Sequence, residues 1–199
     1  YEGSKPHGLT TIGAHVVFAA QPDDHSDRLF RSDGTLTGTS ELAAPCAVRE
    51  PGAIALLHAS PVRAFYAVNC GDRAAALWTS DGTVAGTIPL LGAGEFQPAW
   101  PFYPAPGWVE DGARTLFLQG GNYVSPLELW RTDGTAAGTI RLALLTQERG
   151  ATGAIARRAD GAFQLLVWEH FASLAVWESD GTVAGTALAT VVDLGTTSF

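Results

Sequence analysis

The sequence predicts an all-β fold, a β-propeller of four four-stranded antiparallel blades. An eleven-residue motif occurs four times, and the aspartates at its centre are 48, 52 and 47 residues apart, near the period of propeller blades. Each period also contains four short runs rich in Val, Ile, Leu and aromatic residues, bounded by Gly, Pro, Asp or Asn. No segment repeats apolar residues convincingly at helical spacing, so we expect strands throughout.

The repeats place the blades at about 8–45, 46–92, 93–145 and 146–192, in one domain that covers residues 1–199. The chain would begin with an innermost strand and end with an outermost one, so no exchanged strand would latch a ring. The four blades would then close on themselves, pair with a second copy as half-rings, or form part of a larger propeller.

The repeated motif connects the third and fourth strands of each predicted blade. It reads LWRTDGTAAGT in its third copy: an aliphatic residue, an aromatic residue, Ser or Thr, Asp-Gly-Thr, and finally Gly-Thr. We expect the aspartate to accept backbone hydrogen bonds, the first glycine to take a positive φ, and the threonines to satisfy further backbone groups. These turns are predicted to be structural caps. Their aspartates are Asp33, Asp81, Asp133 and Asp180.

On these residues, the chain resembles secreted and surface-exposed bacterial propeller proteins with Glu-Leu-Trp-x-x-Asp-Gly-Thr-x-x-Gly-Thr repeats. The third copy matches most fully, through Glu128-Leu129-Trp130 and Asp133-Gly134-Thr135. The first copy has Phe30 in place of Trp, and the fourth has Val176 in place of Leu. The motif is also similar to the Asp-box turn of sialidase-like propellers, with different spacing. The resemblance implies a fold and no catalytic residue.

Strands that alternate in direction place the Asp-Gly-Thr turns on one face and the irregular loops on the other, where function is expected. The longest loop, Gly92 to Trp108, is rich in proline and aromatic residues, which either present flat faces to a sugar or simply cover the channel. An arginine of the innermost strand of blade four would reach an anion in the channel. The predicted ligand-binding residues are Trp100, Phe102, Tyr103, Tyr123 and Arg157.

One loop of the same face carries a dense acidic and imidazole group, Asp23, Asp24, His25 and Asp27. Such oxygen ligands suit Ca²⁺, and the histidine would admit a transition metal. The alternative is a solvated turn without a metal. We expect no cofactor, with calcium as the weaker alternative.

Catalysis has little support in the sequence, which contains no nucleophile elbow, P-loop or zinc-protease motif. The alternative is an enzyme whose pocket lies at the central channel and is built from the aromatic insertion with Glu169, His170 and His58. If blades four and one are neighbours in a ring, Glu169 and His170 would converge with the acidic and imidazole group of blade one and supply a general acid and base. His58 is otherwise a structural histidine.

Cys46 lies in the link into the second blade, and Cys70 ends the second strand of that blade. Both fall on the loop face beside adjacent strands, which favours a disulfide over two buried thiols and indicates an oxidising compartment.

The formal net charge of −8 and the scattered arginines argue against a nucleic-acid partner, and no apolar run is long enough to cross a membrane. The chain contains no methionine, so Tyr1 is not a translation start, and we expect a removed leader or a longer parent. We therefore predict a secreted or surface-displayed bacterial binding module for a glycan or a protein. A self-associating structural subunit is a further alternative.

Overall fold

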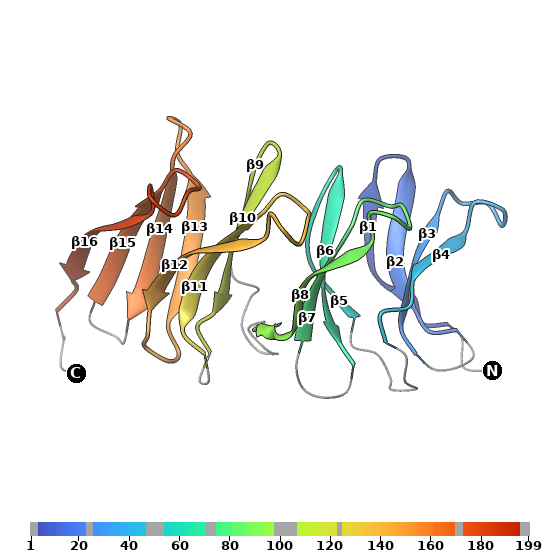
Figure 1. Cartoon of the computed structure of the whole chain (residues 1–199), viewed down its shortest axis with the longest axis horizontal. Helices are drawn as coiled ribbons and strands as arrows, with labels where there is room; N and C mark the ends of the chain where they lie inside the picture. The colour runs from blue at the N-terminus through green and yellow to red at the C-terminus, as the bar shows by residue number, and fades with distance from the viewer. Residues whose placement is uncertain are drawn as a thin grey trace. The chain divides into compact units, whose positions relative to one another are not determined.

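In the computed structural model of the chain, strands form four antiparallel four-stranded sheets, each of which is a meander of consecutive strands (Figure 1). The structure describes residues 4–22, 26–46, 54–70, 75–97, 107–122, 125–169 and 173–195. Within these ranges there is no helix, and so none that is long and apolar enough to span a membrane. The predicted all-β fold of four four-stranded antiparallel blades is confirmed.

The strands follow the repeats of the sequence. Sheet one contains β1 (His7–Ile12), β2 (His15–Ala20), β3 (Arg28–Ser32) and β4 (Ser40–Ala43). Sheet two contains β5 (Ile54–Ser60), β6 (Arg63–Asn69), β7 (Ala75–Ser80) and β8 (Ile88–Phe96). Sheet three contains β9 (Trp108–Asp111), β10 (Arg114–Gly120), β11 (Leu127–Thr132) and β12 (Ile140–Thr146). Sheet four contains β13 (Thr152–Arg157), β14 (Phe163–Glu169), β15 (Ser173–Ser179) and β16 (Ala187–Asp193).

Contacts group the sheets into two compact units, Tyr1–Phe96 and Gln97–Phe199, with two sheets in each. In each unit the first strand of one sheet lies beside the first strand of the next, β1 with β5 and β9 with β13. Each unit has its own core. The first core contains Val17 and Leu29 of sheet one against Tyr66 of sheet two, and the second contains Leu129 of sheet three against Leu165 of sheet four.

Strand β8 is longer than the sequence indicates. We expected it to end near Leu91 and an irregular insertion to follow, but β8 continues to Phe96, which pairs with Ala75 and is buried. The second half of β8 was not predicted because its Gly92-Ala-Gly94 segment lacks the alternation of apolar and polar side chains that indicates a strand.

Candidate functional site

Each sheet has two chemically different ends. The antiparallel order places the hairpin between the first two strands and the Asp-Gly-Thr turn at the same end, which we call the turn end. The connection between the second and third strands and the links between sheets leave from the other end, which we call the loop end.

At the turn end, the polar groups of the repeated motif bond to one another. In sheet three, the amide and hydroxyl of Thr135 donate to Asp133 Oδ1 at 2.9 and 2.7 Å. The Thr135 hydroxyl accepts from the Gly138 amide at 2.9 Å, and the Thr139 hydroxyl donates to the Thr135 carbonyl at 2.7 Å. The hydroxyls of Thr132 and Thr139 lie 2.8 Å apart and close the loop. The other three turns repeat this pattern.

The two glycines of the motif are required for different reasons. The first has a positive φ in every copy, 88° at Gly134, where a side chain would strain the backbone. The second does not, but a Cβ placed on Gly138 would overlap the carboxylate of Asp133. The same overlap occurs in the other three turns, so the aspartate explains why this position holds glycine.

The turn hydrogen bonds also lower the pKa of three of the four turn aspartates. Bonds from the side chain and then the backbone of Thr35 hold the pKa of Asp33 below its ordinary value, and Thr182 does the same for the pKa of Asp180. Burial raises the pKa of Asp81, but the bonds from Thr83 outweigh it and the pKa is lowered overall. These carboxylates are therefore charged acceptors at neutral pH.

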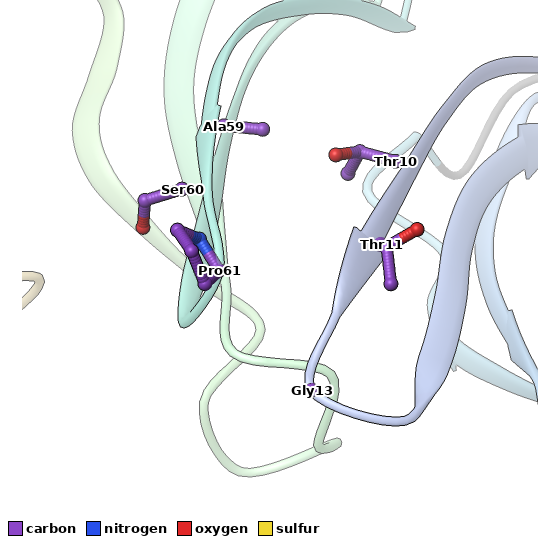
Figure 2. Close-up of a pocket in the computed structure, with 6 residues that line it drawn as sticks. All are labelled: Thr10, Thr11, Gly13, Ala59, Ser60 and Pro61. Atoms are coloured by element: carbon purple, nitrogen blue, oxygen red, sulfur yellow. The ribbon is translucent and has the colours of Figure 1, made fainter.

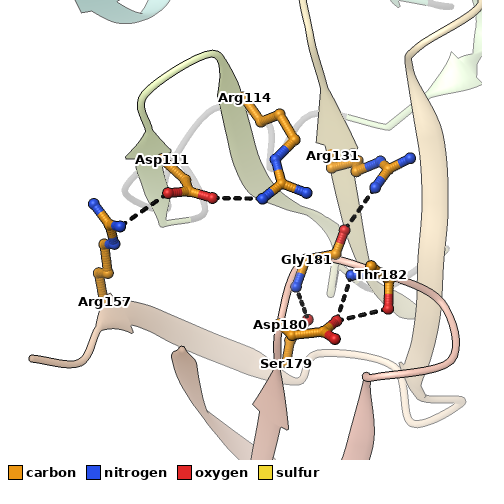
Figure 3. A network of polar contacts seen from close by, with 8 residues as sticks. All are labelled: Asp111, Arg114, Arg131, Arg157, Ser179, Asp180, Gly181 and Thr182. Atoms are coloured by element: carbon orange, nitrogen blue, oxygen red, sulfur yellow. Dashed lines mark hydrogen bonds and ion pairs between the residues drawn. The ribbon is translucent and has the colours of Figure 1, made fainter. Parts of the chain in front are cut away.

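In each unit, an arginine of the first sheet, which we call the leading sheet, contacts the Asp-Gly-Thr turn of the second sheet. Arg131 Nη1 donates to the carbonyl of Gly181, in the Asp-Gly-Thr turn of sheet four, at 2.8 Å (Figure 3). Arg31 donates to the carbonyl of Gly82 in the same way at 3.2 Å. Both arginines occupy the third position of the motif. We did not predict this contact. The sequence does contain a signal for it, because only the first and third copies of the motif, which belong to the first sheet of each unit, have arginine at this position.

Beside that contact, Asp111 bridges two arginines (Figure 3). It accepts from Arg114 Nη2 at 2.6 Å and pairs with Arg157 Nη2 at 3.0 Å. Arg157, predicted to bind an anionic ligand, is thus half-exposed but paired with a carboxylate of the preceding sheet. Its role in binding stays a prediction.

The Glu-Leu-Trp segment of sheet three has a structural function. Glu128 accepts hydrogen bonds from Gln119 Nε2 at 3.1 Å, Trp130 Nε1 at 2.9 Å and Arg141 Nη1 at 2.7 Å. Burial raises the pKa of Glu128, but these three donors outweigh it and leave the pKa lowered. In sheet four an alanine, Ala175, replaces this glutamate.

A cavity of about 530 Å³ opens at the turn end of the first unit, between β1 and β5 (Figure 2). Three residues with hydroxyl groups line it, together with the β1–β2 and β5–β6 hairpins. The two hairpins are joined by a hydrogen bond from the Gly13 amide to the Pro61 carbonyl at 2.9 Å. The lining residues are Thr10, Thr11, Gly13, Ala59, Ser60 and Pro61. None of the residues that we predicted as ligands lies in this cavity.

At the loop end of the first unit, Asp27 joins the two sheets. Its Oδ2 accepts from the Ile54 amide of β5 at 3.3 Å and lies 3.4 Å from His7 Nε2. Cys46 and Cys70 form a disulfide with Cα atoms 5.3 Å apart, which confirms the predicted bond. Asp27 is buried by these contacts.

Most of the predicted loop-face residues lie outside the described part of the chain. These are Asp23, Asp24, His25, Trp100, Phe102, Tyr103, Tyr123 and His170, together with the side chain of Glu169. His58 is described, and its ring stacks on Phe65 with the ring centres 6.3 Å apart. Among the described residues, no group of three or more His, Cys, Asp or Glu could hold a metal ion. The catalytic and metal-binding alternatives therefore stay predictions.

Comparison with known proteins defines the class of the fold. No family model and no curated protein matches the sequence. Among solved structures, a prolyl endopeptidase aligns over 94% of this chain and 29% of its own, with a TM-score of 0.57 at 10% identity. Prolyl oligopeptidase B from Galerina marginata aligns over 95% and 32%, with a TM-score of 0.51 at 13% identity.

A putative TolB from Agrobacterium tumefaciens aligns over 94% of this chain and 66% of its own, with a TM-score of 0.47 at 11% identity. The chain thus spans less than two thirds of each of these structures. The prolyl endopeptidase and prolyl oligopeptidase B contain β-propellers, and the four sheets of this chain are propeller blades. At such low identity the likeness concerns the fold alone.

Proposed function

We propose that the chain is an extracellular binding and assembly module that recognises a carbohydrate or a protein partner through its loop ends. The observation that carries the proposal is the closed hydrogen-bond network of the Asp-Gly-Thr turns. Groups that already bond to one another are poor ligands, since binding would have to break those bonds first. Recognition then falls to the loop ends, whose sequences differ from blade to blade.

Two further observations support the extracellular part of the proposal. The disulfide between Cys46 and Cys70 suits an oxidising compartment. The repeat is the second observation, because it resembles the repeats of secreted and surface-exposed bacterial propellers. The third copy matches those repeats most fully, and its Glu128 accepts a hydrogen bond from Trp130 of the same motif.

A glycan array and an affinity capture on bacterial surface extracts test this proposal. The wild-type chain should bind a defined glycan or protein, and Trp100→Ala should weaken that binding while leaving the unfolding transition unchanged. Asp133→Ala, if folded, should bind as the wild type does. Loss of binding in folded Asp133→Ala would refute the assignment of recognition to the loop ends, and a wild type that binds nothing would count against the proposed function.

A further inference from the structure

The last sheet of the chain has an apolar face that nothing in its own unit covers. Phe163, Leu165 and Val167 of β14 point toward sheet three, so the alternating residues Leu166 and Trp168 point away from it. They are 37% and 48% exposed. Leu174 and Val176 of β15 pair with them, and Val192 of β16, which is 41% exposed, pairs with Leu174. We call this surface, Leu166, Trp168, Leu174, Val176 and Val192, the trailing face.

The same register positions are buried in the leading sheet of each unit. Leu118 and Leu129 of sheet three are cross-strand partners, as Leu166 and Val176 are in sheet four, and the motif places Leu129 and Val176 at equivalent positions. Leu118 and Leu129 are fully buried against sheet four. The trailing face therefore has the composition of a blade interface and lacks its cover.

Both existing interfaces show what covers such a face. Sheet two covers sheet one with the side of β6 and β7 that carries Tyr66 and the motif residue Trp78, which are cross-strand partners. Sheet four covers sheet three with Leu165 and the motif residue Trp177, which are partners in the same way. In each case the covering side is the one that bears the aromatic residue of the motif.

Sheet one carries a covering side of this kind that is unused in its own unit. Phe18 and the motif residue Phe30 are cross-strand partners whose rings stack with centres 5.7 Å apart. They point away from sheet two, because the alternating residues Val17 and Leu29 form the core with it. Val16, on the same side as Phe18, is 37% exposed. We call Val16, Phe18 and Phe30 the leading face.

We propose that the trailing face of one chain binds the leading face of a second copy, head to tail, and so continues the blade order from sheet four into sheet one. This inference rests on the assembly role proposed above and names its partner. The two faces are the two halves of an interface that forms within each unit, so a second copy supplies the cover that each face lacks in its own unit.

The proposed contact differs from the two internal ones at the third position of the motif. Internally, Arg31 and Arg131 donate to a glycine carbonyl of the next turn. The equivalent residue of sheet four is Glu178, which cannot donate and instead accepts from Arg158 at 2.7 Å. The contact between copies is therefore weaker than the internal ones, and Glu178→Arg should strengthen it by supplying a donor for the carbonyl of Gly34 of the second copy.

Analytical ultracentrifugation of the full chain tests the proposal with two variants, Trp168→Glu on the trailing face and Val16→Glu on the leading face. The wild type should associate as its concentration rises, and each variant alone should stay monomeric. An equimolar mixture should form dimers and nothing larger, because one intact trailing face and one intact leading face remain. Circular dichroism and urea unfolding show that each variant is folded. Leu36→Glu, at a turn residue that is 93% exposed and off both faces, should behave as the wild type.

Three results would overturn the proposal. A Val16→Glu variant that still dimerises alone would mean that two trailing faces meet each other. The second result is a wild type and a mixture that are both monomeric, with each variant less stable than the wild type. It would mean that the trailing and leading faces of one chain bind each other. A folded wild type that is monomeric at every concentration and insensitive to Glu178→Arg would also refute it, yet leave any glycan or protein binding at the loop ends intact.

Discussion

Glu128 allows a quantitative test of how the Glu-Leu-Trp segment stabilises its blade. Its carboxylate accepts from Gln119, Trp130 and Arg141, and its side chain is largely buried. A hydrogen bond to a charged group contributes about 1.5–3 kcal/mol, and glutamine keeps one acceptor of the same shape. We expect Glu128→Gln to lower the free energy of unfolding by about 2 kcal/mol, measured by urea denaturation at unchanged m-value.

The effect of Glu128→Gln should depend on pH. The pKa of Glu128 is lowered in the folded chain, so the unfolded chain binds the proton more tightly. The stabilisation is then fully present above the pKa of the unfolded glutamate, about 4.3, and is lost as the pH falls through the lower pKa of the folded state. The difference in unfolding free energy between the wild type and the variant should shrink over that range.

Glu41→Gln is the matched control for Glu128→Gln. Glu41 forms an exposed ion pair with Arg28. In the repeat, Arg28 occupies the position of Glu128, and Glu41 occupies the position of Arg141, so the same ion pair is present with its charges exchanged. An exposed pair contributes about 0.2–1 kcal/mol, so the control should lose less stability. Equal losses in the two variants, or a loss in Glu128→Gln that is the same at pH 7 and in acid, would refute the reasoning.

Three further variants test the turn ends and the disulfide by the same urea denaturation. Arg131→Met should cost about 1–2 kcal/mol, since it removes a charged donor between two sheets, and no loss would contradict that contact. Gly86→Ala should cost about 1–3 kcal/mol because its Cβ meets the Asp81 carboxylate, so an unchanged stability would show that the turn can rearrange. Cys46→Ala with Cys70→Ala should cost about 3 kcal/mol, and a reducing agent should then destabilise the wild type alone.

The sequence predicts the fold well because its repeat encodes local chemistry. The polar constant positions of the motif bond to one another inside their own turn, so four copies of the motif predict four similar turns. Over most of β7 and β11, buried residues alternate with half-buried ones, which fixes the faces of these strands. Only β8 was clearly misjudged in length, at a Gly-Ala-Gly segment without alternation.

The contacts between sheets were harder to predict because they join residues 27 to 51 positions apart. The bond from Arg131 to Gly181 needs two blades in register, and nothing local to Arg131 indicates its acceptor. Asp27, predicted as part of an acidic group, accepts from the amide of Ile54, the first residue of β5 in the next sheet, and the local sequence does not indicate this contact. The cavity beside Gly13 was missed for the same reason, since hairpins of two different sheets line it.

The central claim is that the Asp-Gly-Thr turns hold the blades together and are not themselves a binding site. The most direct measurement is the free energy of unfolding of Asp133→Ala, which removes the acceptor of two Thr135 hydrogen bonds. These bonds are exposed, so we predict a loss of about 1–2 kcal/mol with a retained β circular dichroism spectrum. A stability within about 0.5 kcal/mol of the wild type would be typical of an ordinary surface change and would contradict the structural role of the turns.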